Sequence, residues 1–233
     1  MDDLKLEQFD FDSFNNEQHN KEPDIELEDK KGCGSCLAGT VKGKGMTRQA
    51  KNIYRRAFSE LNLLEILGDE FKTGTSYHCI SGGDIDSLSY LKAVIKQQDL
   101  DYLLFSTWCM ADDDVLQFRE WIEGGQIKRM DAYCGEIFSG SYNKQFIKLK
   151  DVVELCDGRL AICRNHAKIY AGIGKKFAFA IESSANINTN PRIENTAIHI
   201  GKDIYEFYKE FFDVIISFNR DYDNWTPWGA SNP

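Results

Sequence analysis

Short apolar runs alternate with amphipathic segments from residue 76 to residue 218, and this alternation limits the folds open to the chain. The runs have the length of strands, and the segments between them place apolar side chains three and four residues apart, as helices do. The expected strands are Ser76–Ile80, Tyr102–Trp108, Ile127–Tyr133, Arg159–Cys163, the stretch around His166 and Phe177–Ile181. The expected helices are Thr47–Leu67, Asp84–Lys96, Asp112–Ile122, Tyr142–Leu155 and Ile204–Phe218. This pattern predicts an α/β sheet covered by helices on both faces.

The two ends of the chain differ from this middle part. Residues 1–31 are acidic and lack periodicity, which predicts a disordered tail. A Gly- and Lys-rich linker is expected over 32–46, one folded domain over 47–218 and a C-terminal tail over 219–233. Neither an 18-residue apolar run nor a signal-like beginning is present, so no membrane association is expected. Seven cysteines, several within apolar runs, favour reduced thiols and a cytoplasmic location.

The charge is distributed unevenly. Residues 1–29 contain eleven acidic residues and two lysines, and so account for the whole net charge of −9. The rest of the chain is neutral, with 26 acidic and 26 basic residues, which leaves a polyanionic substrate open. Residues 30–59 contain eight basic residues and no acidic one. The acidic tail could cover this basic segment; the simpler interpretation is a solvated linker followed by the polar face of a helix.

Two chemically active side chains, His166 and Lys168, stand one residue apart. In a strand, alternate side chains share a face, so the imidazole and the ammonium would point the same way, roughly 7 Å apart. Asn186 follows the next apolar run along the chain. These three side chains suit phosphoryl-ester chemistry: a histidine attacks phosphorus while a lysine and an asparagine hold the non-bridging oxygens.

These residues resemble the motifs of the phospholipase D superfamily. That family carries His-x-Lys, an Asp after four intervening residues, and Gly-Ser-x-Asn after the next strand. His166-Ala167-Lys168 matches the first part, and Ser183-Ser184-Ala185-Asn186 matches the second with Ser183 in place of Gly. The position of the family Asp, which is mostly structural there, holds Ile173. The resemblance covers about residues 160–200 and implies a phospholipase D-like mixed sheet flanked by helices on both faces.

The resemblance also implies roles for individual residues. His166 would form a phosphohistidine, and Glu194 would orient it. The phosphate would be held by Lys168 and Asn186 with help from Ser184 and Ser183. No metal and no cofactor would be required, because the lysine and the asparagine supply the electrostatic stabilisation.

The mechanism of this family needs a second imidazole as general acid. The chain has four histidines but one His-x-Lys. Members of the family with a single motif form homodimers, which implies a two-fold dimer with His166 of both copies at one site. Alternatively, His78 belongs to a degenerate second half-site, although it lacks a lysine two residues further on.

Other motifs allow further interpretations. Asp84 and Asp86 could bind magnesium at a strand end, but a glycine turn with a helix N-cap explains them as well. The Cys-x-x-Cys at 33–36 has no second pair that would complete a zinc site. Trp108 and Tyr142 could stack on bases, although core packing is the commoner use of such aromatics.

The sequence therefore predicts a metal-independent phosphodiesterase, similar to the phospholipase D-like proteins of phages and mobile elements. The basic segment and the absence of a membrane-binding device favour nucleic acid as the substrate. A protein that binds a phosphate backbone without cutting it, a phospholipid or phosphotransfer enzyme, and a structural or partner-binding protein are the alternatives.

Overall fold

The computed structural model describes residues 44–57, 60–68, 70–82, 85–188 and 192–217. The chain divides into two units, Met1–Gly34 and Ser35–Pro233, and the first unit lies wholly outside the described residues. The predicted acidic tail, most of the linker, the C-terminal tail, the Cys-x-x-Cys and Asp84 lie outside them as well. Among the described helices, none has both the length and the apolar character needed to cross a bilayer.

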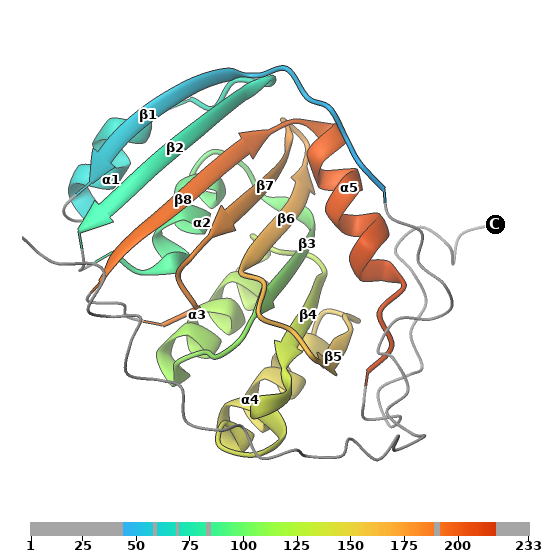
Figure 1. Ribbon diagram of the computed structural model, residues 1–233. Coiled ribbons are helices and arrows are strands. Elements are labelled where there is room, and N and C mark those ends of the chain that lie inside the picture. The colour runs from blue at the N-terminus through green and yellow to red at the C-terminus, as the bar shows by residue number, and fades with distance from the viewer. Residues whose placement is uncertain (1–43, 58–59, 69, 83–84, 189–191, 218–233) are drawn as a thin grey trace, which may run out of the picture. The chain divides into compact units, whose positions relative to one another are not determined.

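One mixed sheet of eight strands organises the second unit (Figure 1). Its spatial order is β1-β2-β8-β7-β6-β3-β4-β5. The strands are β1 (Lys51–Ala57), β2 (Thr75–Gly82), β3 (Leu100–Thr107), β4 (Met130–Gly135), β5 (Leu160–Cys163), β6 (Ile169–Gly174), β7 (Ala178–Ser183) and β8 (Ile193–Ile200). The pairs β1–β2, β3–β4 and β4–β5 are parallel, and the four pairs that join β2, β8, β7, β6 and β3 are antiparallel.

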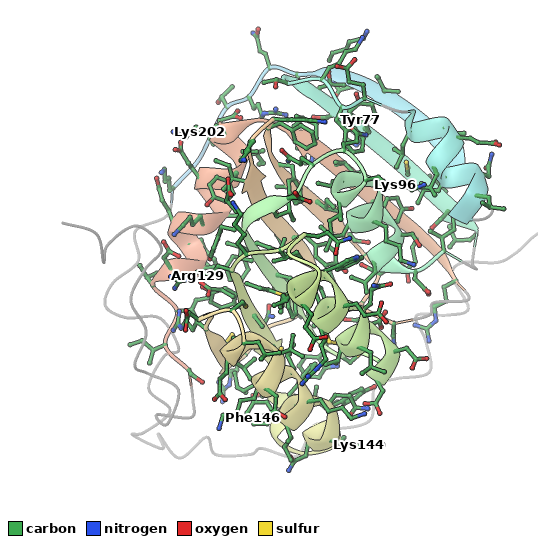
Figure 2. The ribbon with its side chains drawn as sticks, turned by 180° about the vertical axis from the view of Figure 1, so that it is seen from behind. Tyr77, Lys96, Arg129, Lys144, Phe146 and Lys202 are labelled. Carbon is green, nitrogen blue, oxygen red and sulfur yellow. The ribbon has the colours of Figure 1, made fainter. Side chains whose placement is uncertain are left out.

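Helices cover both faces of the sheet, as the sequence predicts. The core on one face includes buried side chains of α1 (Glu60–Leu67), α2 (Ser87–Ile95), α3 (Asp112–Glu123) and α4 (Asn143–Glu154), and that on the other includes those of α5 (Lys202–Asp213). Figure 2 views the sheet from the side of α1–α4. Strand β3 shows why its sequence is continuously apolar: Leu103 and Phe105 enter the first core, while Tyr102 and Leu104 enter the second.

The prediction of one helix over Thr47–Leu67 is wrong in its first half. Residues 51–57 form strand β1, and only 60–67 form the helix α1. Strand β1 pairs with β2 along its whole length, from Lys51 opposite Thr75 to Ala57 opposite Ser81. These backbone hydrogen bonds are non-local, so they outweigh the local spacing of apolar residues that indicated a helix.

Strand β8 was not among the predicted strands, and it lies in the middle of the sheet between β2 and β7. A period-two signal was present, because Thr196, Ile198 and Ile200 are buried on the α1–α4 side while the residues between them are not. The remaining elements are confirmed with ends that shift by a few residues, apart from the stretch around His166, which is described with the site.

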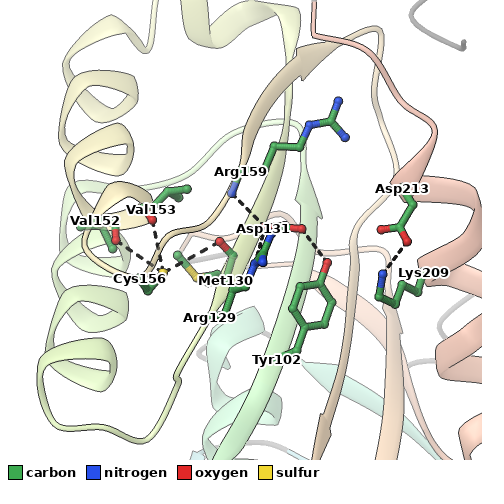
Figure 3. A network of polar contacts seen from close by, with 10 residues as sticks. All are labelled: Tyr102, Arg129, Met130, Asp131, Val152, Val153, Cys156, Arg159, Lys209 and Asp213. Atoms are coloured by element: carbon green, nitrogen blue, oxygen red, sulfur yellow. Dashed lines mark hydrogen bonds and ion pairs between the residues drawn. The ribbon is translucent and has the colours of Figure 1, made fainter. Parts of the chain in front are cut away.

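A buried polar network lies in the part of the sheet where β4 begins (Figure 3). The Asp131 carboxylate, which is 0 % exposed, accepts hydrogen bonds from the Tyr102 hydroxyl at 2.8 Å and the Arg159 backbone N–H at 2.8 Å. The guanidinium of Arg129 lies 3.8 Å from the same carboxylate. Burial raises the pKa of the Tyr102 hydroxyl well above its ordinary value, and the negative charge of Asp131 acts in the same direction.

Candidate functional site

His166 and Lys168 lie in the loop between β5 and β6, and the prediction that they belong to a strand is wrong. Sheet pairing of β6 starts only at Ile169, opposite Ser106 of β3 and Glu182 of β7. The loop nevertheless brings the two side chains together. The Lys168 Nζ lies 2.9 Å from His166 Nδ1 and 3.3 Å from Nε2, and it donates to the His166 carbonyl at 2.9 Å. The imidazole is exposed while Lys168 is 8 % exposed, so a buried cation lies beneath an accessible imidazole.

Asn165 explains why these residues form a defined loop rather than a strand. Its side-chain amide donates to the Tyr133 carbonyl at 2.9 Å and to the Ser106 hydroxyl at 2.8 Å. Its Oδ1 accepts the backbone N–H of Ala167 at 3.0 Å. These local and cross-strand bonds replace the sheet pairing that His166 and its neighbours would otherwise make. Asn165 was not among the predicted site residues, and its only signal in the sequence is a polar amide directly before the motif.

The second half of the motif lies against the first. The backbone N–H of Ser183 donates to the Lys168 carbonyl at 3.0 Å, because β6 and β7 pair there. The Ser183 hydroxyl shares a 2.8 Å hydrogen bond with the hydroxyl of Thr196 on β8. A backbone hydrogen bond thus joins the His-x-Lys loop to the end of β7, the two segments that resemble the two parts of the family motif.

Ser184, Glu194 and Asn186 follow at the same edge of the sheet. The Ser184 hydroxyl donates to Glu194 Oε2 and accepts the backbone N–H of Asn195 at 3.1 Å. Asn186 precedes Ile187, whose carbonyl accepts the N–H of Ala111 at 3.0 Å, so the loop is held against the segment that follows β3. Glu194 therefore accepts a hydrogen bond from Ser184. The predicted role of Glu194 in orienting His166 stays a prediction.

The buried position of Lys168 affects its protonation. Burial lowers the pKa of its ammonium group, while the thiolate form of Cys109 and the carboxylate of Glu194 act in the opposite direction. Cys109 follows β3 and is 7 % exposed, and burial raises the pKa of its thiol. Because Cys109 acts on Lys168, the segment that follows β3 contributes to the surroundings of this lysine. The sequence motifs did not indicate this contribution.

His78 and His199 form a separate cluster on the other face of the sheet from α1–α4. Their rings are 5.8 Å apart, His199 Nδ1 lies 2.8 Å from the Ser76 hydroxyl, and His199 Nε2 lies 3.7 Å from Glu182. Both side chains lower the pKa of the Glu182 carboxyl. His199 stands five residues after Glu194 on β8, about 17 Å further along the strand, while the Glu182 that it contacts directly precedes Ser183 of the motif.

Two basic residues that precede β1 form ion pairs with α5. Lys44 forms an ion pair with Glu210 of α5. Arg48 donates to Asp203 Oδ2 at 2.8 Å, to the Ser76 hydroxyl at 3.0 Å and to the Ile200 carbonyl at 2.7 Å. The charge of Arg48 is therefore directed at α5 and the sheet, and any nucleic-acid contact must come from other cations.

The alternative magnesium site is not supported by the described residues. Asp86 stands at the N-cap of α2, while Asp84 lies outside the description. Across the part of the chain that the structure describes, no group of three or more His, Cys, Asp or Glu side chains is arranged to hold a metal ion.

Comparisons with known proteins add little to this geometry. No family model matches the chain, and no curated protein matches it. Among solved structures, the chain is similar to the polyphosphate kinase of Porphyromonas gingivalis, with a TM-score of 0.47 and 12 % sequence identity. This match covers 64 % of the present chain and 26 % of that protein, so the chain spans about a quarter of its length.

Proposed function

We propose that this chain is a metal-independent phosphodiesterase of the phospholipase D type, and that it hydrolyses nucleic acid. The observation that carries the proposal is the contact of the buried Lys168 ammonium with the exposed His166 imidazole, on a loop joined to Ser183. An accessible nucleophile with a fixed cation beside it is what attack on an anionic phosphodiester requires.

The reaction would take two steps. A ring nitrogen of His166 attacks phosphorus, the bond from phosphorus to the leaving oxygen breaks, and a second imidazole protonates that oxygen. Water then attacks the phosphohistidine and gives its proton to the second imidazole, which restores His166 and releases a phosphomonoester. Lys168 and Asn186 would hold the non-bridging oxygens in both steps.

The second imidazole is proposed to be His166 of a second copy across a two-fold axis. The described contacts of His199 are with His78, Ser76 and Glu182 rather than with His166, which favours this over a second half-site within one chain. In one alternative the site binds phosphate but does not hydrolyse it. This alternative takes account of Ile173, which stands at the position of the family Asp and packs against the apolar core under α5. A phosphate-binding protein without hydrolysis would fit that departure.

The direct test is hydrolysis in excess EDTA by the purified chain. The substrates are single- and double-stranded DNA, RNA and phosphatidylcholine vesicles, and sedimentation gives the mass in parallel. We expect cleavage of nucleic acid by a species of twice the chain mass. Salt-sensitive binding without cleavage would select the phosphate-binding alternative, and cleavage of the lipid alone would select the phospholipase.

The burial of Lys168 predicts an alkaline limit on this activity. The neutral amine no longer attracts phosphate, so kcat/KM falls as the pH rises through the lowered pKa of Lys168. A guanidinium stays charged throughout this range. We therefore expect Lys168→Arg, although slower near neutrality, to keep its own plateau to higher pH in profiles from about pH 7 to 11. The same alkaline limb in both proteins would assign the limit to another group.

A further inference from the structure

An indole ring lies beside the proposed nucleophile. Trp108 directly follows β3, and its ring centroid is 5.7 Å from that of His166, with the two planes inclined by 50°. The side chain is half-buried. The pairing of β3 with β4 and the loop held by Asn165 together fix this neighbourhood, so the position of the ring follows from the fold.

Gly135 at the end of β4 makes room for the indole. A Cβ at this position would lie 2.6 Å from Trp108 Cε3 and 3.2 Å from the Asn165 carbonyl oxygen. Such distances require neighbouring atoms to move, and the second of these atoms belongs to the backbone of the site loop. The glycine therefore lets the indole and the His166 loop approach the same strand end.

The charges around Trp108 indicate what its ring would contact. Lys168 lies beside His166, and Arg164, whose side chain is 67 % exposed, stands two residues before it and lies 3.7 Å from Glu136. Glu136 balances the charge of Arg164, so Lys168 is the cation beside His166 that favours a phosphate group. Its charge disfavours a quaternary ammonium headgroup, which would otherwise bind an indole face. A nucleobase is flat and uncharged, and it can stack on an aromatic side chain next to a bound phosphate.

We propose that Trp108 stacks on the base adjoining the reactive phosphate, and that the substrate is therefore an unpaired nucleic-acid strand. This inference rests on the proposed function and specifies its substrate class. A nucleotide whose phosphate meets His166 has its base within reach of the indole. In a duplex the bases are already stacked on their neighbours, so this contact is open mainly to single strands.

The test compares two chains of equal length and charge: oligothymidylate and a wholly abasic phosphodiester chain. We expect the wild type to prefer oligothymidylate by about tenfold or more, in cleavage or in equilibrium binding, the size expected from stacking one base. Trp108→Ala should lose this preference while Trp108→Phe keeps part of it. Phe211→Ala, which removes an aromatic side chain 45 % exposed on α5, is the matched control and should leave the preference unchanged.

The possible results separate this inference from the proposed function. Cleavage that depends on His166 but is equal on both chains would overturn the stacking role and leave the phosphodiesterase intact. No cleavage, with a binding preference that Trp108→Ala abolishes, would support stacking and reject hydrolysis. Equal losses on both chains in Trp108→Ala, together with lower thermal stability, would make Trp108 a packing residue. Binding of phosphatidylcholine vesicles that requires Trp108 would also overturn the proposal.

Discussion

Replacing His166 by Ala is expected to lower phosphodiester hydrolysis by about 10⁴-fold or more, because the variant loses the atom that attacks phosphorus. The exposed imidazole contacts Lys168 without being part of either core, so the variant should fold and bind substrate. Initial rates in EDTA on single-stranded DNA measure the effect, and thermal unfolding checks the fold. His199→Ala is the matched control, since that ring belongs to the cluster with Glu182 and His78, and we expect its rate to stay within a few-fold of the wild type.

A covalent intermediate gives an independent readout of the same role. Denaturing the enzyme during turnover of radiophosphate-labelled DNA should leave label on the protein, in a bond that is stable in alkali and labile in acid. The label should be absent from His166→Ala. If the label on the wild type is found at a residue other than His166, that residue is the nucleophile. If cleavage survives the substitution, His166 has no part in the mechanism.

The layered α/β architecture could be predicted because most of its strands and helices have a recognisable local pattern of apolar residues. Strand β3 is apolar on both faces, and α5 places Ile204, Tyr205 and Phe212 on one side, so their surroundings follow from their own sequences. Strand β1 could not be predicted in this way. It exists because β2 offers it a backbone partner, and such pairing between distant segments leaves no periodic signal in the strand itself.

The candidate site shows the same division. His166 and Lys168 could be named from their spacing and Ser183 from the resemblance to the family motif, and the pairing of β6 and β7 brings Ser183 to the backbone of Lys168. Their surroundings could not. Trp108 could be named as a possible base-stacking residue, but its contact with His166 could not be foreseen. That contact and the bonds of Asn165 to Ser106 and Tyr133 join residues dozens of positions apart, and no local pattern reports such contacts.

Replacing Asp131 by Ala is expected to cost about 3–5 kcal/mol of unfolding free energy, although Asp131 is remote from the motif. The substitution removes the carboxylate to which the Tyr102 hydroxyl and the Arg159 N–H donate, and which lies 3.8 Å from the guanidinium of Arg129 (Figure 3). Buried donors that lose their acceptor are costly, because no water replaces it. For a chain of this length, such a loss lowers the midpoint of thermal unfolding by on the order of 10 °C.

Asp101→Ala is the matched control for this prediction, because Asp101 also accepts from a cation but at the surface. Its Oδ1 lies 2.6 Å from Lys128 Nζ, and the side chains of the pair are 37 % and 56 % exposed. Exposed pairs of this kind contribute about 0–1 kcal/mol, so the midpoint should hardly move. Urea unfolding of both variants measures the difference. Equal small losses would mean that Arg129, Tyr102 and the Arg159 N–H find other partners once Asp131 is gone, and that the network does not depend on its carboxylate.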